Sequence, residues 1–274
     1  ASSPTGPAFE GAQISSGQRA APGAIERVRI DKETLEPRFR VIGCDVWSDQ
    51  DNFIDKSAKV NISGICGSGI IEVIAEMYLT GIINQDGVIA PVSGKNSHLI
   101  FKQGRTWCYL LYSADKPIVI TQNDVRAIQL AKAALHAGIR LLMNHLGIQK
   151  VDRIGLAGAF GSHIDVKYAM ILGLIPDCNL DKVGSVGNAA GTGARIALLN
   201  FPSRLEISEI LPAVEKIETA IEKKFQDYFI EAMTIPHKTE IYSELSNQVS
   251  LPAVEEKKRD ESTNRRKRRQ RNKV

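Results

Sequence analysis

Three glycine-rich turns, each placed where an apolar, strand-like run gives way to a helix-like run, constrain the fold of this chain most. They read GICGSG at residues 64–69, GLAGAFG at residues 155–161 and GNAAGTG at residues 187–193. A glycine at such a boundary can adopt a positive φ and has no Cβ to keep a ligand away from the backbone. The first N–H groups of the following helix have no partner inside the helix, and anions and nucleotides often bind them. Three such turns in one chain predict a nucleotide-binding cleft.

None of the turns matches a complete phosphate-binding motif, so a second interpretation stays open. Gly155, Gly158 and Gly161 do not have the G-x-G-x-x-G spacing of a dinucleotide-binding fold. Residues 64–69 lack the G-K-[ST] ending of a P-loop. In the second interpretation, each glycine only permits a tight turn or the close packing of a helix.

Strand-like and helix-like patterns alternate along the chain. Strands are expected at residues 25–42 (as a hairpin), 88–112, 117–121, 153–157 (buried) and 182–186. Helices are expected at residues 68–79, 121–146, 165–172, 189–199 and 203–225. This alternation predicts an α/β fold, in which ligands bind where strands lead into the N-termini of helices.

Two capping signals predict where helices begin. Thr121 and Asp124 form a T-x-x-D pair at the start of the helix at residues 121–146. Ser203 and Glu206 read as a capping box, which predicts a helix that starts there and runs to about residue 225.

The composition favours a globular body followed by a basic tail. With 274 residues, of which 43% are hydrophobic, the chain can bury one large core or two modest ones. Its first residues, ASSPTGPAFEGAQ, read like the middle of a domain, which suggests a fragment of a longer protein. Seven Lys and Arg residues lie in the last ten positions, so the rest of the chain is slightly acidic despite a net charge of +4.

The tail is expected to be disordered and solubilising rather than to bind nucleic acid or an acidic membrane. We place it at residues 236–274, which are polar and carry no aromatic residue among the clustered basic ones. No run approaches 18 uninterrupted apolar residues, so no membrane-spanning segment is expected.

The cysteine spacing excludes common metal motifs. Cys44, Cys66, Cys108 and Cys178 form no C-x-x-C pair, so neither a structural zinc site nor an iron-sulfur loop is expected in this chain. Reduced thiols and a cytoplasmic location follow as the default. Cys66 is either a reactive thiol at a helix start or, as we favour, a buried filler at a tight turn.

Five segments of the chain, in order, carry a family resemblance: ASSPTGPAFEGAQISSGQRAAPGAIERV, GICGSGIIEVIAEMYLTGII, ITQNDVRAIQLAKAALHAGI, IGLAGAFGSHID and VGNAAGTGARIALL. Over residues 1–235 they resemble the C-terminal domain of the ATP-dependent reductive activators of corrinoid proteins. Those are ferredoxin-type proteins with a domain of the actin, heat-shock chaperone and sugar-kinase superfamily. The resemblance implies a ribonuclease H-like lobe in which helices flank a mixed sheet.

The resemblance also implies candidate ATP-binding residues. In the superfamily ATP lies between two lobes, and a late glycine-rich turn approaches its adenosine. Gly158, Ala159, Phe160 and Gly161 resemble that turn, while Gly187, Asn188 and Gly191 lie in a segment that resembles the helix connecting the lobes. The first turn has no clear counterpart, so Gly64, Gly67, Ser68 and Gly69 are assigned to the nucleotide only because a helix begins there.

The chain departs from the superfamily in lacking both D-x-G-T-[TN] phosphate hairpins, the second of which would lie immediately before Ala1. Glu10 is the acidic residue nearest to that position. It could position a water or magnesium ion, but a turn carboxylate is the simpler interpretation. Lys132 and Arg126 on the long helix either face adenine or, as we favour, lie on a solvated face.

The function implied by the resemblance is the return of an oxidised cob(II)amide to cob(I)amide. The implied cofactors are ATP with Mg²⁺, and a [2Fe-2S] cluster bound by a missing N-terminal domain that supplies the electron. The implied partner is a corrinoid protein or corrinoid-dependent methyltransferase, with a homodimer as a further option. This chain alone is expected to be inactive. A small-molecule kinase lobe of the same superfamily and a non-catalytic nucleotide-binding module stay open as alternatives.

Overall fold

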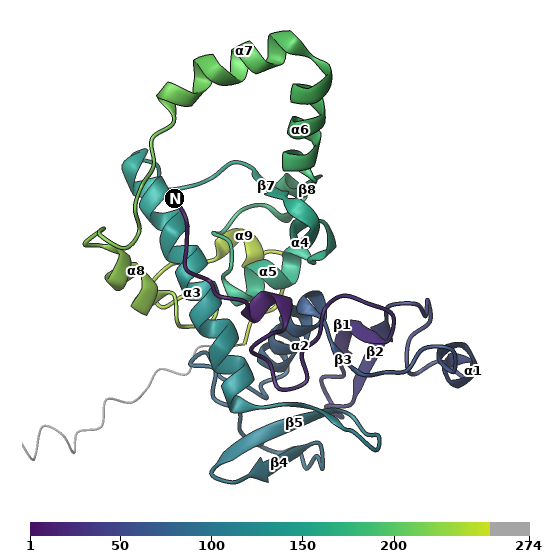
Figure 1. Ribbon diagram of the computed structural model, residues 1–274. Helices are drawn as coiled ribbons and strands as arrows, with labels where there is room; N and C mark the ends of the chain where they lie inside the picture. The colour runs from purple at the N-terminus through teal and green to yellow at the C-terminus, as the bar shows by residue number, and fades with distance from the viewer. Residues whose placement is uncertain (253–274) are drawn as a thin grey trace, which may run out of the picture.

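The structure of the chain is a computed structural model that describes residues 1–252, except for the side chains of Ala159 and Phe160. Residues 253–274, the basic end of the predicted tail, lie outside the described residues. Figure 1 shows a body of helices and short strands, with an arch of two helices above it. The α/β prediction is confirmed.

The strands of the described residues form three small sheets rather than one. The first is mixed, in the order β2 (Pro37–Val41), β1 (Ala24–Ile30), β3 (Gly64–Ile65), with β1 antiparallel to β2 and parallel to β3. The second is antiparallel and contains β4 (Ile100–Gln103), β5 (Thr106–Tyr112) and β6 (Ile118–Ile120). The third is the parallel pair β7 (Ile154–Ala157) and β8 (Val183–Gly187). The predicted hairpin over residues 25–42 is therefore confirmed as β1 and β2.

Two helices make most of the core. All residues from 68 to 78 of α2 (Gly67–Leu79) are buried, and this helix packs against β1 and α5 (Val166–Leu172). The long helix α3 (Gln122–His145) starts at the capping box that the sequence predicts: Thr121 Oγ1 accepts the Asp124 N–H at 3.2 Å, and the Asp124 carboxylate accepts the Thr121 N–H at 2.8 Å. The burial of α2 thus agrees with its apolar sequence, and the start of α3 agrees with its capping box.

The arch consists of α6 (Ala189–Leu199) and α7 (Phe201–Ile210), and neither helix has a buried residue. The bounds of α6 match the prediction. The predicted capping box at Ser203 is wrong, because α7 begins after Asn200 with Pro202 in its first turn, so Ser203 lies inside the helix. The helix also ends before Pro212 instead of continuing to residue 225, where the short α8 (Phe225–Glu231) begins.

The remaining short elements connect these parts. They are η1 (Ala8–Glu10), α1 (Phe53–Ser57), α4 (Gly158–His163), η2 (Leu180–Lys182), η3 (Leu211–Ala213) and α9 (Ser243–Ser246). Tyr242 and Leu245 are buried against the body, so the boundary predicted at residue 235 is too early for the packed part of the chain. Within residues 1–252, no helix is both long and apolar enough to cross a membrane.

Candidate functional site

The parallel pair β7–β8 brings two of the three glycine turns to the same edge. Both strands run in the same direction and Ala157 lies beside Gly187, so the turns at their C-terminal ends are neighbours. The backbone turns into α4 at Gly158, whose φ is 92°, and toward α6 at Gly187, whose φ is 69°. The C-terminal edge of parallel strands is where ligands bind in open α/β sheets. Contrary to the prediction, no residue of β7 is buried: its residues alternate between partly exposed and exposed, because one face of the pair is open.

The two positive-φ glycines face open space. Among the residues that the structure describes, chain neighbours aside, a Cβ added at Gly158 or Gly187 would meet no atom within 4 Å. A Cβ at Gly161 would lie 3.0 Å from the Leu156 backbone, and one at Gly191 would lie 2.6 Å from the Asn188 side chain. Packing therefore explains Gly161 and Gly191, whereas Gly158 and Gly187 leave room for a ligand to approach the backbone.

Exposed hydroxyl groups surround this edge. Ser162 Oγ donates to the Gly158 carbonyl at 3.0 Å, and Ser185 Oγ donates to Ser162 Oγ at 3.1 Å. The Gly187 N–H donates to Ser185 Oγ at 3.1 Å. Asn188 caps α6 by accepting the Gly191 N–H at 2.9 Å. An edge that combines accessible backbone with hydroxyl donors and acceptors suits a nucleoside, whose base and ribose have both apolar faces and hydrogen-bonding groups.

The GICGSG turn between β3 and α2 is filled by the protein itself. A Cβ at Gly69 would lie 2.4 Å from the Ile25 carbonyl oxygen, and one at Gly64 would lie 2.6 Å from the Ser16 carbonyl oxygen. Cys66 is 1% exposed and its N–H donates to Ile25, as the buried-filler interpretation expects. Close backbone packing thus explains Gly64 and Gly69. We leave the whole turn, with Gly64, Gly67, Ser68 and Gly69, out of the proposed site.

The other sequence candidates lie elsewhere. Glu10 is exposed on η1, which packs mainly against α2 and α3. Arg126 is exposed, as the solvated-face interpretation expects. Both interpretations of Lys132 are wrong: it is 1% exposed, and its Nζ donates to the Thr234 carbonyl at 2.6 Å and the Pro236 carbonyl at 2.7 Å. Burial holds the pKa of Lys132 well below its ordinary value.

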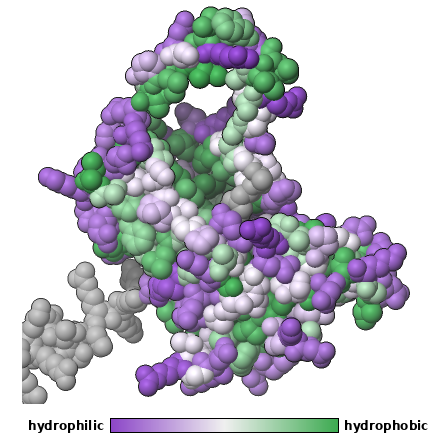
Figure 2. All heavy atoms as spheres, in the orientation of Figure 1, coloured by the Kyte–Doolittle hydropathy of each residue, from purple (hydrophilic) through white to green (hydrophobic). Residues whose placement is uncertain are grey.

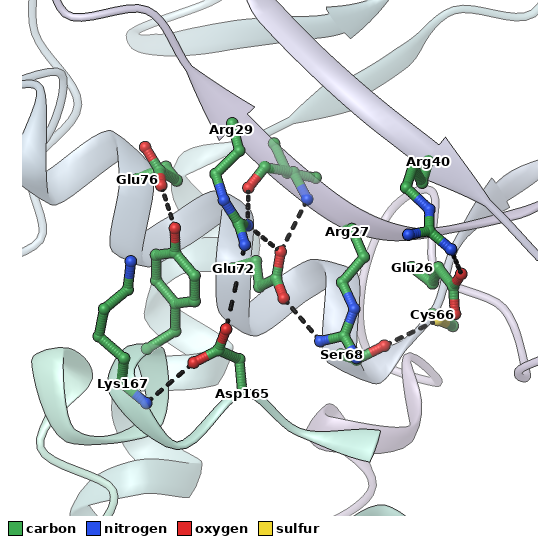
Figure 3. Close-up of polar contacts among 12 residues, drawn as sticks. Glu26, Arg27, Arg29, Arg40, Cys66, Ser68, Glu72, Glu76, Asp165 and Lys167 are labelled. Carbon is green, nitrogen blue, oxygen red and sulfur yellow. Dashed lines mark hydrogen bonds and ion pairs between the residues drawn. The ribbon is translucent and has the colours of Figure 1, made fainter. Parts of the chain in front are cut away.

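A buried charge network fixes α2 to its neighbours (Figure 3). The fully buried carboxylate of Glu72 accepts from Arg27 Nη1 at 2.8 Å, Arg29 Nη1 at 2.5 Å and the Val28 N–H at 2.9 Å. One turn later, Glu76 accepts the Tyr168 hydroxyl of α5, and burial together with this hydrogen bond raises the pKa of Tyr168. Since the carboxylates bind groups of β1 and α5, the network is structural. Two acidic residues four apart inside an apolar helix were the signal that could have predicted it.

Two histidines and a glutamate form a second buried polar cluster, at α3. Ligand atoms of His136, His237 and Glu240 lie within 4.8 Å of one another, a composition typical of a metal site. Three of the four ring nitrogens already have hydrogen-bond partners, however. His136 uses Nδ1 toward the Gly173 carbonyl and Nε2 toward Glu240, both at 3.1 Å, and His237 Nδ1 accepts N–H groups of Thr239 and Glu240. The bonds to His237 Nδ1 keep that ring's proton on Nε2, so we interpret the cluster as a hydrogen-bond network.

Comparison with known proteins gives a consistent family result. Residues 1–246 match the family described as the C-terminal domain of RACo, the ASKHA domain. The corrinoid activation enzyme RamQ of Eubacterium limosum is 35% identical over 243 residues, which cover 84% of this chain and 37% of RamQ. The [Co(II) methylated amine-specific corrinoid protein] reductase of Methanosarcina barkeri is 27% identical over 243 residues, which cover 84% of this chain and 41% of the reductase.

A solved structure agrees with the sequence relatives. The reductive activator for corrinoid, iron-sulfur protein superposes with a TM-score of 0.70 at 34% identity, covering 85% of this chain and 35% of that one. The chain therefore spans between 35% and 41% of the length of these three proteins. The likeness applies to one domain of each relative.

Proposed function

Because this chain belongs to the family of the C-terminal ASKHA domain of RACo, we propose that it is the nucleotide-binding lobe of an ATP-dependent reductive activator of a corrinoid protein. The named relatives activate or reduce corrinoid proteins. The observation that supports a nucleotide site within the chain is the open edge of β7–β8, where no atom of the described residues lies within 4 Å of the Cβ positions of Gly158 and Gly187.

We propose that the adenosine of ATP lies on this edge. The turn at Gly158 gives it access to the backbone, and Ser162 and Ser185 offer hydroxyl groups beside that turn. Neither phosphate hairpin is present in the sequence, so we assign the triphosphate and its Mg²⁺ to a second lobe upstream in the longer protein. This division explains how one chain can hold the base yet leave phosphoryl transfer to residues outside it.

In the proposed role, ATP provides the free energy for an electron transfer that is otherwise unfavourable. The electron would come from an iron-sulfur domain outside this chain and reach the cobalt of the partner protein. Binding of ATP between the lobes can favour a closed state only by the difference in its affinity for the closed and open states. The turns at Gly158 and Gly187 would contribute to this difference in affinity, because they would contact the nucleotide more closely in the closed state than in the open one.

The test is Gly158→Asn in the longer protein that carries both lobes. Asparagine tolerates the positive φ at this position better than most residues, and its side chain would occupy the space assigned to adenosine. We expect ATP affinity, measured by calorimetry, to fall about tenfold or more, or about 1.4 kcal/mol. The melting temperature should hardly change.

Gly94→Asn is the matched control, because Gly94 also has a positive φ of 77° and open space around its Cβ position, but lies in a loop before β4. It should leave ATP affinity unchanged. Equal affinity in both variants would refute the adenosine assignment.

The 274-residue chain alone should release no phosphate from ATP. If the longer protein converted ATP to ADP only with a small-molecule acceptor, and the phosphoryl group were found on that acceptor, it would be a kinase. If it bound ATP without releasing phosphate, it would be a binding module.

A further inference from the structure

The C-terminal strap, residues 233–249, is held on α3 by polar side chains from one face of the helix. Gln129 Nε2 donates to the Met233 carbonyl at 2.9 Å, and Lys132 donates to Thr234 and Pro236. One and two turns further along, His136 and Arg140 both bind the Glu240 carboxylate, at 3.1 and 2.9 Å. The spacing of 129, 132, 136 and 140 places these residues along a single stripe.

The other side of the strap is held by the loop after α5. The Asp177 carboxylate accepts the N–H groups of Glu244 at 2.9 Å and Leu245 at 3.0 Å, and the Tyr242 hydroxyl donates to the Ile175 carbonyl at 3.1 Å. Tyr242 and Leu245 fill apolar positions beneath these bonds. The strap is therefore a docked segment that joins α3 to α5.

His237 lies at the centre of the strap and must be neutral to keep its bonds. The residue is 8% exposed, and its Nδ1 accepts the N–H of Thr239 at 3.3 Å and of Glu240 at 3.0 Å. A protonated imidazole has no acceptor nitrogen, so protonation would break both hydrogen bonds. The ring also borders a cleft of about 570 Å³, which gives protons a route to it.

The surroundings of His237 oppose a further positive charge. The ring centroids of His136 and His237 are 4.8 Å apart, and Lys132 and Arg140 lie on the same face of α3. The two ring nitrogens of His136 face the Gly173 carbonyl and the Glu240 carboxylate. Glu240 is the acidic group that faces both rings, and it is already engaged by His136 and Arg140. Tyr78, Asp86 and Lys238 also line the cleft that borders His237.

We propose that His237 is an acid-sensitive switch whose protonation releases the C-terminal strap from α3. The proton removes the acceptor that orders residues 237–240 and adds a charge beside His136. The released segment would withdraw Tyr242 and Leu245 from the body and expose the apolar positions that they fill.

The sign of the pH dependence follows from the folded and unfolded states. Burial, followed by the charge of His136, lowers the pKa of His237 from 6.5 to about 4. Docking is then fully stabilised above pH 6.5, because neither state binds the proton there. Between pH 6.5 and 4 the released state binds the proton and the docked state does not, so docking weakens as the pH falls. Below pH 4 this group contributes no further change.

The experiment is hydrogen exchange of the 274-residue chain at pH 7.5 and 4.5, analysed as protection factors. We expect the protection of residues 237–249 to fall by about tenfold to a hundredfold at the lower pH. Protection of β5 serves as the internal measure of global folding. His237→Asn should abolish the pH dependence of strap protection, because the asparagine Oδ1 can accept the same two N–H groups without titrating. His145→Asn, at an exposed histidine of α3, should retain it.

If the strap loses as much protection at pH 4.5 in His237→Asn as in the unchanged chain, the proposal is overturned. If the whole chain unfolds at pH 4.5, an NMR titration of the His237 ring between pH 8 and 5 decides instead. A ring that does not titrate down to pH 5 has its midpoint below that value, which supports the switch. A midpoint near the ordinary histidine value would overturn it, because the docked strap would then not resist protonation.

Discussion

The two kinds of glycine turn in this chain look alike in sequence and have opposite surroundings. At the β3–α2 junction, Gly69 lies against the Ile25 carbonyl, and residues 68–78 of the helix that follows are all buried. At the β7–β8 edge, Gly158 and Gly187 face open space, and α6 has no buried residue. A missing Cβ can thus admit either the protein's own backbone or a ligand. The distance to the nearest atom separates the two cases, and the sequence motif does not.

The polar side chains near the closed junction and near the open edge differ in the same way. The closed junction is flanked by the Glu72 network, in which a buried carboxylate satisfies two arginines and a backbone N–H (Figure 3). The open edge carries neutral hydroxyl groups that bind one another at the surface. Buried charges that are fully paired fix one arrangement of strand and helix, whereas exposed hydroxyls can exchange partners with a ligand.

The largest effect that would test this comparison is expected from Glu72→Gln. The substitution removes the negative charge shared by Arg27 and Arg29 while keeping the side-chain volume. We expect a loss of about 3 kcal/mol in the free energy of unfolding, measured with denaturant. Glu33→Gln is the control, since Glu33 is 83% exposed and pairs with Lys95 at 3.6 Å, and it should cost less than about 0.5 kcal/mol. A Glu72 variant as stable as the control would show that the network does not hold the closed junction.

A smaller effect is expected from adding a single methyl group at each junction. In Gly69→Ala the new Cβ meets the Ile25 carbonyl oxygen at 2.4 Å, which should destabilise the chain by about 2 kcal/mol. Gly193→Ala adds the same group to α6, where no described atom outside the helix's own backbone lies within 4 Å of the new Cβ. It should be neutral or stabilise by up to about 1 kcal/mol through helix propensity. Equal effects of the two substitutions on the free energy of unfolding would contradict the contrast between closed and open turns.

Elements with strong local signals could be predicted from the sequence. The Thr121–Asp124 capping box fixes the start of α3, and the alanine-rich segment gives α6 its bounds. The five segments that carry the family resemblance also sufficed to identify the family, which the match over residues 1–246 confirms. A family motif and a helix cap can each be recognised in the sequence, because the residues that form each of them lie within a few positions of one another.

Features built from distant residues could not be predicted. Lys132 reads as a surface residue, yet it binds carbonyls of Thr234 and Pro236, about a hundred residues away, and is buried by them. Tyr242 and Leu245 lie in a mostly polar stretch, beside an Ile241 that is exposed, so no periodicity marks them as core. At residue 203 the local signal was itself misleading, because Asn200 and Pro202 start the helix earlier.

The smallest effect is expected on the arch, where the open region is most exposed. Leu198, Leu199 and Phe201 are 72%, 81% and 65% exposed, and Figure 2 shows apolar residues gathered along α6 and α7. In the 274-residue chain, Leu199→Ser should change the free energy of unfolding by less than about 0.5 kcal/mol, because the side chain buries little. Leu172→Ser, at a leucine of α5 that is 1% exposed, should cost about 3 kcal/mol or more.

The same pair of substitutions in the longer protein shows whether the arch stays open there. Contiguous exposed apolar residues usually mark a contact surface. If the second lobe proposed above covers α6 and α7, Leu199→Ser should destabilise the longer protein by about 1.5 kcal/mol or more, approaching the cost of burying a serine in place of a leucine. An effect as small as in the 274-residue chain would mean that the lobes meet elsewhere. The nucleotide edge would then have to be closed by movement of α4 and the turn at Gly187 alone.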